Sequence, residues 1–316
     1  MDIGLKGIGT AVPQKILTNF DLEKMVETTD EWIVTRTGIR ERHVLDRDEK
    51  IADLVSKAAK LACDNAGQAS EKIDFVISAT LTPDRISPAQ SFEIARELGA
   101  GNAFCFDMNA ACSGFIYGLG VGESLLRTRR ITNGLVTAGE QLTRTADYSD
   151  RSSCILFGDA ASAVLLTNDH PEHVILYTEL GSDPSMSNEV VIGGINDLLN
   201  ERRSAYYFRQ NGKAIFRFAV TKIKELMETV PAKAGISPDQ VRYVIPHQAN
   251  TRIIDAASEF NPKVEFLKNI ERYGNTSSAS IGLVLAENWS RFERGDYLLL
   301  IGFGGGLSWG ASLIQW

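Results

Sequence analysis

The sequence predicts an α/β fold of two similar halves, with helices covering the faces of the sheets. Short apolar runs typical of buried strands alternate with helical stretches along the chain, and this alternation is the pattern of α/β proteins. The length of 316 residues fits two packed halves of roughly 150 residues each. A composition that is 44% hydrophobic and 23% charged supports a large core.

The expected elements follow the same order in both halves. In the first half we expect strands at 75–80, 103–107 and 134–139 and helices at 91–98 and 113–126. In the second half we expect strands at 242–245, 264–266 and 297–301 and helices at 251–259 and 277–289. Cys112 and Asn275 each open a helix after a strand, which indicates a duplication with halves at 1–168 and 169–316.

Charge and hydropathy argue against several classes of protein. A net charge of −7 makes general nucleic-acid binding a poor prediction. No apolar run reaches the roughly 20 residues that a membrane span needs, and the first residues lack the charged and apolar regions of a signal peptide. We therefore expect a cytoplasmic protein that binds neither nucleic acid nor a membrane.

The four cysteines, at positions 63, 105, 112 and 154, form no CxxC pair. Zinc and redox chemistry are therefore not expected, and no metal site is predicted. In a reducing compartment all four side chains should be free thiols. We expect one or two of them to be reactive and the others to be small core residues.

Cys112 is the candidate nucleophile and lies within the segment Asn-Ala-Ala-Cys-Ser-Gly. It follows a predicted strand and opens a predicted helix, where backbone N–H groups and the helix dipole favour a thiolate. Its small neighbours leave room for a substrate. A buried structural cysteine fits the same pattern, so the local sequence leaves both interpretations open.

Of the four histidines, His247 is the candidate for chemistry. His170 and His173 flank a polar connector, and His43 lies among charged residues. His247 follows an apolar strand in the segment Pro-His-Gln-Ala-Asn, and the end of a strand can present a side chain to a cleft. A structural histidine fits this position equally well.

Two segments near the C-terminus could also carry function. Asn275, in Gly-Asn-Thr-Ser, fits a turn residue or a helix cap. The segment Gly-Phe-Gly-Gly-Gly at 302–306 fits a tight turn, and it lacks the spacing of a nucleotide-binding glycine loop. Its adjacent glycines also place backbone N–H groups where an oxyanion could meet them.

Taken together, these segments resemble the thiolase superfamily and, most closely, the β-ketoacyl-acyl-carrier-protein synthase III family. The resemblance rests on the order and spacing of the segments around Cys112, His247 and Asn275 and of the glycine-rich turn. The stretches 29–42 and 157–160 are also close to signatures of that family. The similarity covers nearly the whole chain.

The resemblance implies a thiolase-like five-layer αβαβα fold, a homodimer, and the decarboxylative condensation of an acyl-CoA primer with malonyl-acyl carrier protein that starts type II fatty-acid synthesis. Cys112 would carry the acyl group, and His247 and Asn275 would hold the malonyl thioester carbonyl. The amides of Cys112 and Gly305 would form the oxyanion hole. No cofactor is implied, because the loss of carbon dioxide supplies the driving force and the nucleophile.

The resemblance also implies three groups of binding residues. Coenzyme A contacts are implied for Thr28, Trp32, Arg36, Arg151 and Asn250. Walls of the acyl pocket are implied for Ser87, Leu142, Phe157 and Phe303, and contacts to the carrier protein for Arg217 and Arg252. Without the resemblance, the tryptophan and the arginines would be interpreted as ordinary surface side chains.

The sequence departs from the family at three places. Ser87 stands where relatives often carry a phenylalanine that crosses the dimer interface into the partner's acyl pocket. We therefore expect a larger pocket that accepts primers longer than acetyl. Glu259 replaces a basic contact to the carrier protein, and the segment 260–270 is slightly short. Both differences put the usual carrier-protein surface in doubt.

Related activities fit the sequence less well. Thiolase needs a second cysteine in the glycine-rich turn, where Phe303 stands, and elongating synthases use a second histidine where Asn275 stands. The catalytic glutamate of HMG-CoA synthase has no convincing match, and the N-terminal signature argues against a plant-type polyketide synthase. Two alternatives remain, namely a related acyltransferase or polyketide-starter enzyme with another acceptor, and a non-catalytic scaffold.

Overall fold

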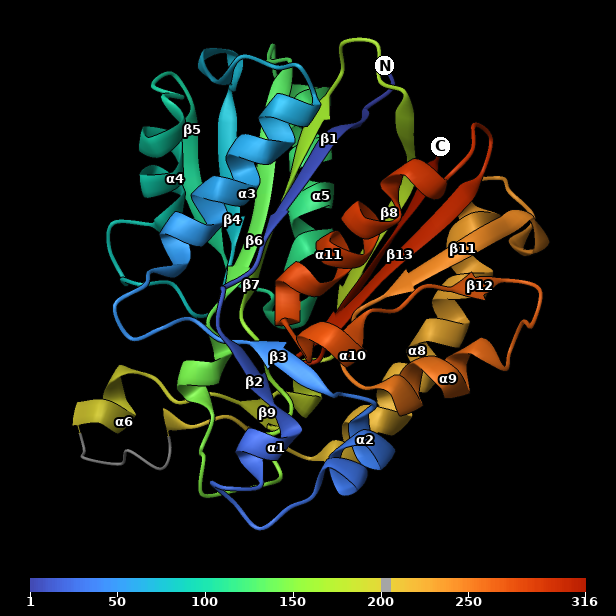
Figure 1. Cartoon of the computed structure of the whole chain (residues 1–316). Coiled ribbons are helices and arrows are strands. Elements are labelled where there is room, and N and C mark those ends of the chain that lie inside the picture. The colour runs from blue at the N-terminus through green and yellow to red at the C-terminus, as the bar shows by residue number, and fades with distance from the viewer. Residues whose placement is uncertain (200–205) are drawn as a thin grey trace.

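Two β-sheets lie next to each other, with one helical layer between them and another on each outer face (Figure 1). The computed structural model describes residues 1–199 and 206–316. The sheets are joined where β1 (Gly4–Ala11) pairs with the start of β8 (His173–Ser182). The predicted five-layer αβαβα arrangement is confirmed.

The N-terminal sheet has the strand order β1-β7-β6-β4-β5. Its other strands are β4 (Phe75–Ala79), β5 (Phe104–Met108), β6 (Asn133–Glu140) and β7 (Ala160–Thr167). β4 is parallel to β5 and β6, whereas β7 is antiparallel to β1 and β6. The outer face is covered by α3 (Ile51–Asn65) and α4 (Gln90–Leu98).

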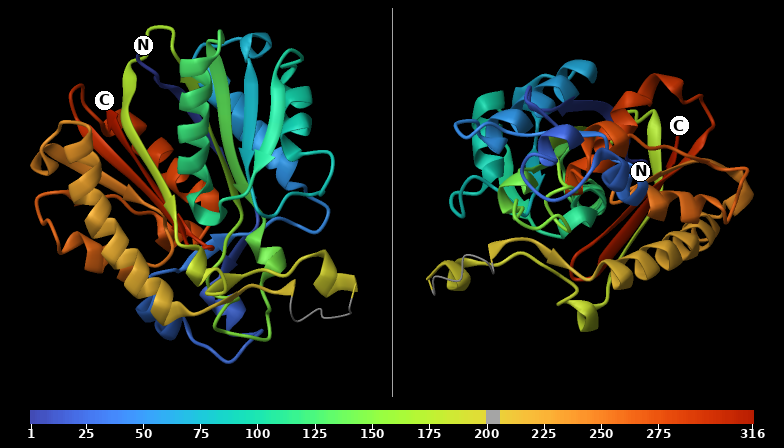
Figure 2. Two further views of the ribbon diagram at one scale, coloured as in Figure 1. Left: turned by 180° about the vertical axis from the view of Figure 1, so that it is seen from behind. Right: turned by 60° about the horizontal axis from the view of Figure 1, so that its bottom comes forward.

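The C-terminal sheet repeats this order as β8-β14-β13-β11-β12. Its other strands are β11 (Val241–Pro246), β12 (Glu265–Phe266), β13 (Tyr297–Gly304) and β14 (Ser308–Gln315). Its outer face is covered by α8 (Gly212–Lys233) and α9 (Thr251–Ser258), and Figure 2 shows the length of α8 from behind. The predicted boundary between residues 168 and 169 falls between β7 and β8.

The middle layer consists of α5 (Gly114–Thr128) and α11 (Ser280–Glu287). Each of these helices contacts strands of both sheets, and α11 is buried along most of its length, whereas burial in α5 is concentrated in its first two turns. Their first turns meet through two short 3₁₀ turns, η2 (Ala111–Ser113) and η6 (Ser277–Ala279). Residues from the two halves are therefore brought to one point at the N-terminal ends of these helices.

Shorter elements gather below the two sheets, at the end where these turns meet (Figures 1 and 2). They include antiparallel pairs of β2 with β3 and of β9 with β10. Their bounds are β2 (Ile16–Thr18), α1 (Asn19–Leu22), α2 (Asp30–Thr37), β3 (Glu41–His43), β9 (Val190–Val191), α6 (Ile195–Leu199), β10 (Arg209–Gln210) and α10 (Ile270–Tyr273). Among the described residues, no helix combines the length and apolar character needed to cross a membrane.

The predicted strands are all present within a few residues of their expected bounds, but two predicted helices begin differently. The helix expected at 113–126 starts at Gly114, after the 3₁₀ turn η2. The helix expected at 277–289 is divided into η6, α11 and a 3₁₀ turn at Trp289–Arg291. In both cases a backbone with positive φ precedes the helix, which apolar periodicity does not reveal.

Small residues allow α3 to lie directly on β1. Ala58 and Ala62 face the strand and are fully buried. A Cβ atom at Gly9 would overlap the carbonyl oxygen of Ala58 and the backbone nitrogen of Ala62. Because these are backbone atoms of a packed helix, the contact cannot be relieved by rotating a side chain.

The substitution Gly9→Ala should therefore lower the free energy of unfolding by about 1–3 kcal/mol, the usual cost of overpacking a core. Gly101→Ala is the matched control, since a Cβ atom there would meet no atom of residues 1–199 and 206–316 within 4 Å. Chemical denaturation of both variants measures the difference. Equal stabilities would show that α3 and β1 are less closely packed than described.

Candidate active site

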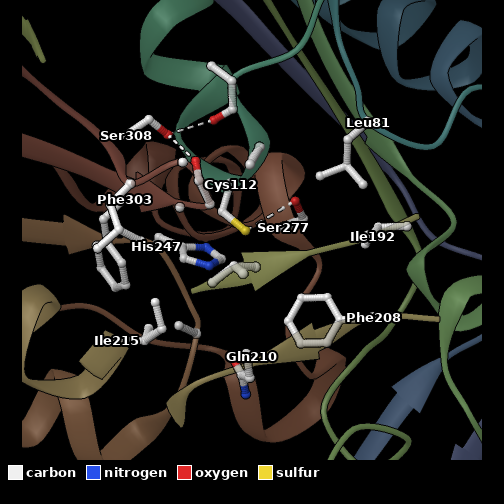
Figure 3. A pocket seen from close by; sticks show the side chains of 18 of the residues that line it. Leu81, Cys112, Ile192, Phe208, Gln210, Ile215, His247, Ser277, Phe303 and Ser308 are labelled. Atoms are coloured by element: carbon white, nitrogen blue, oxygen red, sulfur yellow. Dashed lines mark hydrogen bonds between the residues drawn. The ribbon is translucent and has the colours of Figure 1, made fainter. Parts of the chain in front are cut away.

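A cavity of about 640 Å³ opens between the two halves, where η2 and η6 meet. Cys112 of the N-terminal half and His247 and Asn275 of the C-terminal half all line it. Figure 3 shows the sulfur of Cys112 next to the imidazole of His247 and the hydroxyl of Ser277. The structure therefore brings together the three side chains that the sequence singled out for catalysis.

A strained turn presents the thiol of Cys112 to the cavity. Ala111, directly before it, has a φ of 47°, a conformation that costs a residue with a side chain about 1–3 kcal/mol. The side-chain oxygen of Asn109 accepts a hydrogen bond from the amide of Ala111 at 3.1 Å and so supports the turn. The chain then enters η2 and α5, which places Cys112 at a helix start.

The turn at Asn275 repeats this geometry in the second half. The side-chain oxygen of Asn275 accepts from the amide of Ser277 at 2.9 Å, and Ser277 has a φ of 50°. The structural counterpart of Asn275 is therefore Asn109 and not Cys112, which corrects the correspondence expected from the sequence. Because its oxygen is held by the backbone, the amide NH₂ of Asn275 is the group available to the cavity.

His247 is held rigidly at the end of β11. Its amide donates to the carbonyl of Ile301 at 2.7 Å, and its Nδ1 lies 2.7 Å from Oγ of Ser280. The ring packs edge-on against Phe303, with centroids 5.2 Å apart. Burial lowers the pKa of His247 to about 3, so the imidazole is neutral near neutral pH.

The glycine-rich turn lies directly against the nucleophile. A Cβ atom at Gly304 would be 2.6 Å from the amide nitrogen of Cys112, so a larger residue would push the turn away. The next residue, Gly305, lines the cavity together with Cys112. The two residues predicted to form an oxyanion hole therefore share one wall of the cavity.

The thiol of Cys112 is not ionised at rest, in contrast to the expectation from its place at a helix start. Burial raises its pKa to about 12, and the charge of Glu140 acts in the same direction. The hydroxyl of Ser277, 3.3 Å from the sulfur, opposes this shift but does not overcome it. Burial is the largest contribution to this shift of the pKa.

Glu140 is a fully buried carboxyl group that the sequence analysis did not identify. It accepts hydrogen bonds from the Thr82 hydroxyl at 2.6 Å and the Ser278 hydroxyl at 2.8 Å. Burial nevertheless raises its pKa to about 7. A charged residue at the end of a long apolar strand is the signal in the sequence that could have found it.

Three of the four predicted acyl-pocket residues, Leu142, Phe157 and Phe303, line the cavity. Ser87 lies outside it on the exposed surface of this chain. The cavity also has apolar walls that the sequence analysis missed, contributed by Leu81, Ile192, Phe208 and Ile215 (Figure 3). Ile192 and Phe208 flank the two-residue strands β9 and β10, whose patterns are too short to predict.

The residues expected to hold coenzyme A gather near α2 and the start of α9. Guanidinium groups of Arg36 and Arg151 lie over the ring of Trp32, at 5.6 and 4.9 Å from its centroid. Asn250 donates to the carbonyl of Arg36 at 3.0 Å, and the buried hydroxyl of Thr28 has no hydrogen-bond partner among the described residues. The structure therefore places these five residues in one region.

The two arginines expected to contact a carrier protein lie on adjacent helices. Arg217 is exposed on α8, and Arg252 is exposed in the first turn of α9. These helices pack against each other on the outer face of the C-terminal sheet. Glu259, which follows the last residue of α9, is exposed as well. The surface therefore carries both basic and acidic groups.

The cavity combines a thiol, two neutral hydrogen-bond donors and the backbone of a glycine turn. A thiol can accept an acyl group and release it again, while fixed donors can stabilise an oxygen that gains negative charge. Within residues 1–199 and 206–316, no group of three or more His, Cys, Asp or Glu side chains is arranged to hold a metal ion. The arrangement is suited to acyl transfer.

The sequence of the chain matches one known family in both halves. Residues 106–184 match the family described as 3-oxoacyl-[acyl-carrier-protein (ACP)] synthase III, and residues 232–316 match its C-terminal part. The β-ketoacyl-[acyl-carrier-protein] synthase III of Aquifex aeolicus is 42% identical to this chain, with 99% of this chain and 100% of that protein aligned.

Solved structures give the same result. The crystal structure of 3-oxoacyl-[acyl-carrier-protein] synthase III from Aquifex aeolicus superposes with a TM-score of 0.92 and 39% identity, over 99% of this chain and 100% of that chain. The priming β-ketosynthase of the R1128 polyketide biosynthetic pathway also superposes with a TM-score of 0.92, at 33% identity over 99% of this chain and 96% of that chain.

The buried carboxyl of Glu140 should make stability depend on pH. Its pKa is raised from an ordinary 4.5 to about 7, so the folded protein holds this proton after the unfolded chain has released it. The free energy of unfolding should therefore fall as pH rises between these values and then level off. Glu140→Gln removes this dependence. The melting temperature of the variant should therefore rise relative to that of the wild type as the pH increases from 4.5 to about 7.

Thermal denaturation of Glu140→Gln and wild type across this pH range measures the effect. Glu228→Gln, which removes an exposed carboxyl from α8, controls for the loss of a carboxylate in general. A constant difference in melting temperature at every pH would contradict the raised pKa.

Proposed function

Because the chain belongs to the 3-oxoacyl-[acyl-carrier-protein] synthase III family, we propose that it condenses an acyl-CoA primer with malonyl-acyl carrier protein through an acyl group carried on Cys112. This is the condensation that starts type II fatty-acid synthesis. The observation that carries the proposal is the shared cavity of Cys112, His247 and Asn275.

In the first half-reaction, the sulfur of Cys112 attacks the thioester carbonyl of the primer. The carbonyl oxygen becomes negatively charged, and the amides of Cys112 and Gly305 stabilise it. The carbon–sulfur bond to coenzyme A then breaks, which leaves the acyl group on Cys112. Apolar walls from Leu142 and Phe157 surround the acyl chain.

In the second half-reaction, His247 and Asn275 hold the thioester oxygen of malonyl-acyl carrier protein. Loss of carbon dioxide converts the malonyl thioester into an enolate, with negative charge on this oxygen. The carbon of the enolate then attacks the acyl group on Cys112. Neutral donors suit this step, since a strong acid would protonate the carbanion before it reacts. The low pKa of His247 keeps its imidazole in the neutral form. The scheme requires no resident cofactor, because decarboxylation drives it.

Coenzyme A and the carrier protein bind outside the cavity in this proposal. Trp32, Arg36 and Arg151 offer one aromatic and two guanidinium planes to the nucleotide, and arginine also pairs with phosphate. Thr28 contributes a buried hydroxyl that no residue in the described part of the chain bonds, and Asn250 lies beside Arg36. The exposed Arg217 and Arg252 support docking of an acidic carrier protein beside α8 and α9.

We also propose that two copies of the chain pair along β5, the edge strand of the N-terminal sheet. Exposed apolar side chains near this edge support pairing, with Ile86 at 80%, Phe92 at 55% and Phe104 at 40% exposure. Ser87 lies beside Ile86 and would then face the partner's cavity. A serine there leaves more room for the acyl chain than the phenylalanine of many relatives.

A second candidate function is the priming of a polyketide or another acyl transfer with a different acceptor. The similarity to the R1128 priming β-ketosynthase favours it. The exposed Glu259 directly after α9 also favours it, because an acidic residue stands there in place of the family's basic contact to the carrier protein. Release of carbon dioxide with malonyl-acyl carrier protein separates condensation from simple acyl transfer.

Substitutions of the three cavity residues should separate the two half-reactions. Cys112→Ala should form no acyl-enzyme, whereas His247→Ala and Asn275→Ala should still become acylated by acetyl-CoA. Each of the latter two should lose roughly 10²-fold in carbon dioxide release from malonyl-acyl carrier protein, the effect of removing one fixed donor. Mass spectrometry of the intact protein and labelled carbon dioxide measure the two steps.

Wild-type protein that gains no acyl mass would favour a non-catalytic scaffold. Acylation of Cys112→Ala to the same extent as wild type would place the acyl group on another residue.

The primer preference should follow from the size of residue 87. The wild type should use butyryl- and octanoyl-CoA as well as acetyl-CoA, and Ser87→Phe should lower the use of octanoyl-CoA selectively because the larger ring fills the partner's pocket. Rates with the three primers, and sedimentation to verify the dimer, measure this. A strict preference of the wild type for acetyl-CoA would refute the larger pocket.

A further inference from the structure

A buried carboxyl group lies behind the thiol, and one hydroxyl group lies between the two. Oγ of Ser277 is 3.3 Å from Sγ of Cys112 and 3.4 Å from Oε1 of Glu140. A serine hydroxyl has one proton to donate and two lone pairs that accept. When Ser277 donates its proton to Glu140, its oxygen is therefore able to accept the proton of the Cys112 thiol.

We propose that Glu140 takes up the proton of Cys112 through Ser277 during acylation and returns it to the same sulfur after condensation. The inference rests on the proposed function, because it concerns the thiol that carries the acyl group. Ser277 is a catalytic residue in this scheme, since its hydroxyl contacts the reacting sulfur. Glu140 is a positioning residue that acts through Ser277.

The proton moves away from the sulfur during acylation. The sulfur of Cys112 forms a bond to the acyl carbon while the carbon–sulfur bond to coenzyme A breaks. The thiol proton passes to Oγ of Ser277, and the proton of Ser277 passes to the carboxylate of Glu140. Coenzyme A leaves as a thiolate and takes one proton from water. The result is an acylated Cys112 beside a neutral Glu140.

The proton returns after condensation. The malonyl carboxylate leaves as carbon dioxide, and its bonding electrons form the enolate whose carbon attacks the acyl carbon. The bond from that carbon to Sγ of Cys112 then breaks and leaves a thiolate, which regains its proton from Glu140 through Ser277. A neutral Glu140 also avoids placing a second negative charge near the enolate.

Glu140 is better suited than His247 to hold this proton for the lifetime of the acyl-enzyme. The pKa of His247 is lowered to about 3 by burial, so its imidazole releases a proton at once near neutral pH. The pKa of Glu140 is raised to about 7 by burial, which makes both uptake and release possible. Donors from Leu81 and Thr82 hold its carboxylate in place.

Few charged groups face this network. Cys112, Tyr117 and His247 are the titratable groups that line the cavity beside it, among the residues that the structure describes. Two carboxylates on segments next to β6 are bonded to groups other than Glu140. Asp84 accepts a hydrogen bond from an amide of α3, and Asp159 accepts one from the Thr143 hydroxyl. The segments that bond Glu140 directly offer it only neutral hydroxyls and amides.

The test measures single-turnover acylation of Cys112 by acetyl-CoA, with rapid quenching and mass spectrometry, from about pH 5.5 to about pH 8.5. The wild-type rate should rise through the pKa of Glu140, near 7. Ser277→Ala and Glu140→Gln should lack this rise and be slower by roughly 10²-fold at the upper end. The difference should shrink at the lower end, where Glu140 of the wild type is already protonated.

Ser278→Ala is the matched control, because it removes a hydroxyl that bonds Glu140 at 2.8 Å while Ser277 stays in place. Since that bond lowers the pKa of Glu140, the rise should persist and move to higher pH. A purely structural role would change rates equally at every pH. Parallel pH profiles for wild type, Ser277→Ala and Glu140→Gln would therefore overturn the relay.

Alkylation of Cys112 by iodoacetamide tests the proton relay from Cys112 through Ser277 to Glu140 independently of the proposed function. It probes the thiol without any acyl substrate and should show the same rise with pH in wild type, lost in Ser277→Ala and Glu140→Gln. Wild-type protein that is alkylated with this profile but never acylated would refute the proposed function alone. Acylation without the pH-dependent rise would refute the relay alone.

Discussion

The meeting of two strained turns is the constraint on which the rest of the site depends. One turn has its positive φ at Ala111 and the other at Ser277, and an asparagine side chain supports each of them. Because α5 and α11 lie in one layer between two sheets, their first turns have little freedom to move apart. The two similar halves therefore form a single cavity, to which one half contributes the thiol of Cys112 and the other the carboxamide of Asn275.

Burial is the main influence on the protonation of two side chains that line this cavity. Burial keeps the imidazole of His247 neutral and the thiol of Cys112 protonated at rest. A neutral imidazole suits a condensation that proceeds through a carbanion, whereas a protonated thiol requires a proton acceptor before it can be acylated. The carboxyl of Glu140, linked through Ser277, gives that proton a destination inside the protein.

The sequence was sufficient for the layers of the fold and for Cys112, His247 and Asn275, because each follows or opens a strongly patterned element. It was not sufficient for the turns themselves, since a positive φ at Ala111 or Ser277 leaves no mark on hydrophobic periodicity. The expectation that the helix start favours a thiolate at Cys112 failed for a related reason. Helix starts can be found from a sequence, but the depth of burial of one sulfur depends on residues from both halves.

Partners that come from distant segments were also beyond prediction from the sequence. Glu140 stands at the end of β6, and its donors come from the segment after β4 and from η6. Ile192 and Phe208 reach the cavity from segments with almost no regular structure. Such contacts depend on tertiary packing, which a local pattern does not encode.

In the proposed reaction, the imidazole of His247 and the carboxamide of Asn275 hold the malonyl thioester in the same cavity in which the thiol of Cys112 carries the acyl group. A crystal structure of the protein with a malonyl thioester analogue that cannot lose carbon dioxide tests this arrangement most directly. The thioester oxygen should lie within hydrogen-bonding distance of both His247 and Asn275, and the methylene carbon of the analogue should face the sulfur of Cys112. An analogue bound with its thioester outside this cavity, or with its oxygen turned away from both donors, would contradict it.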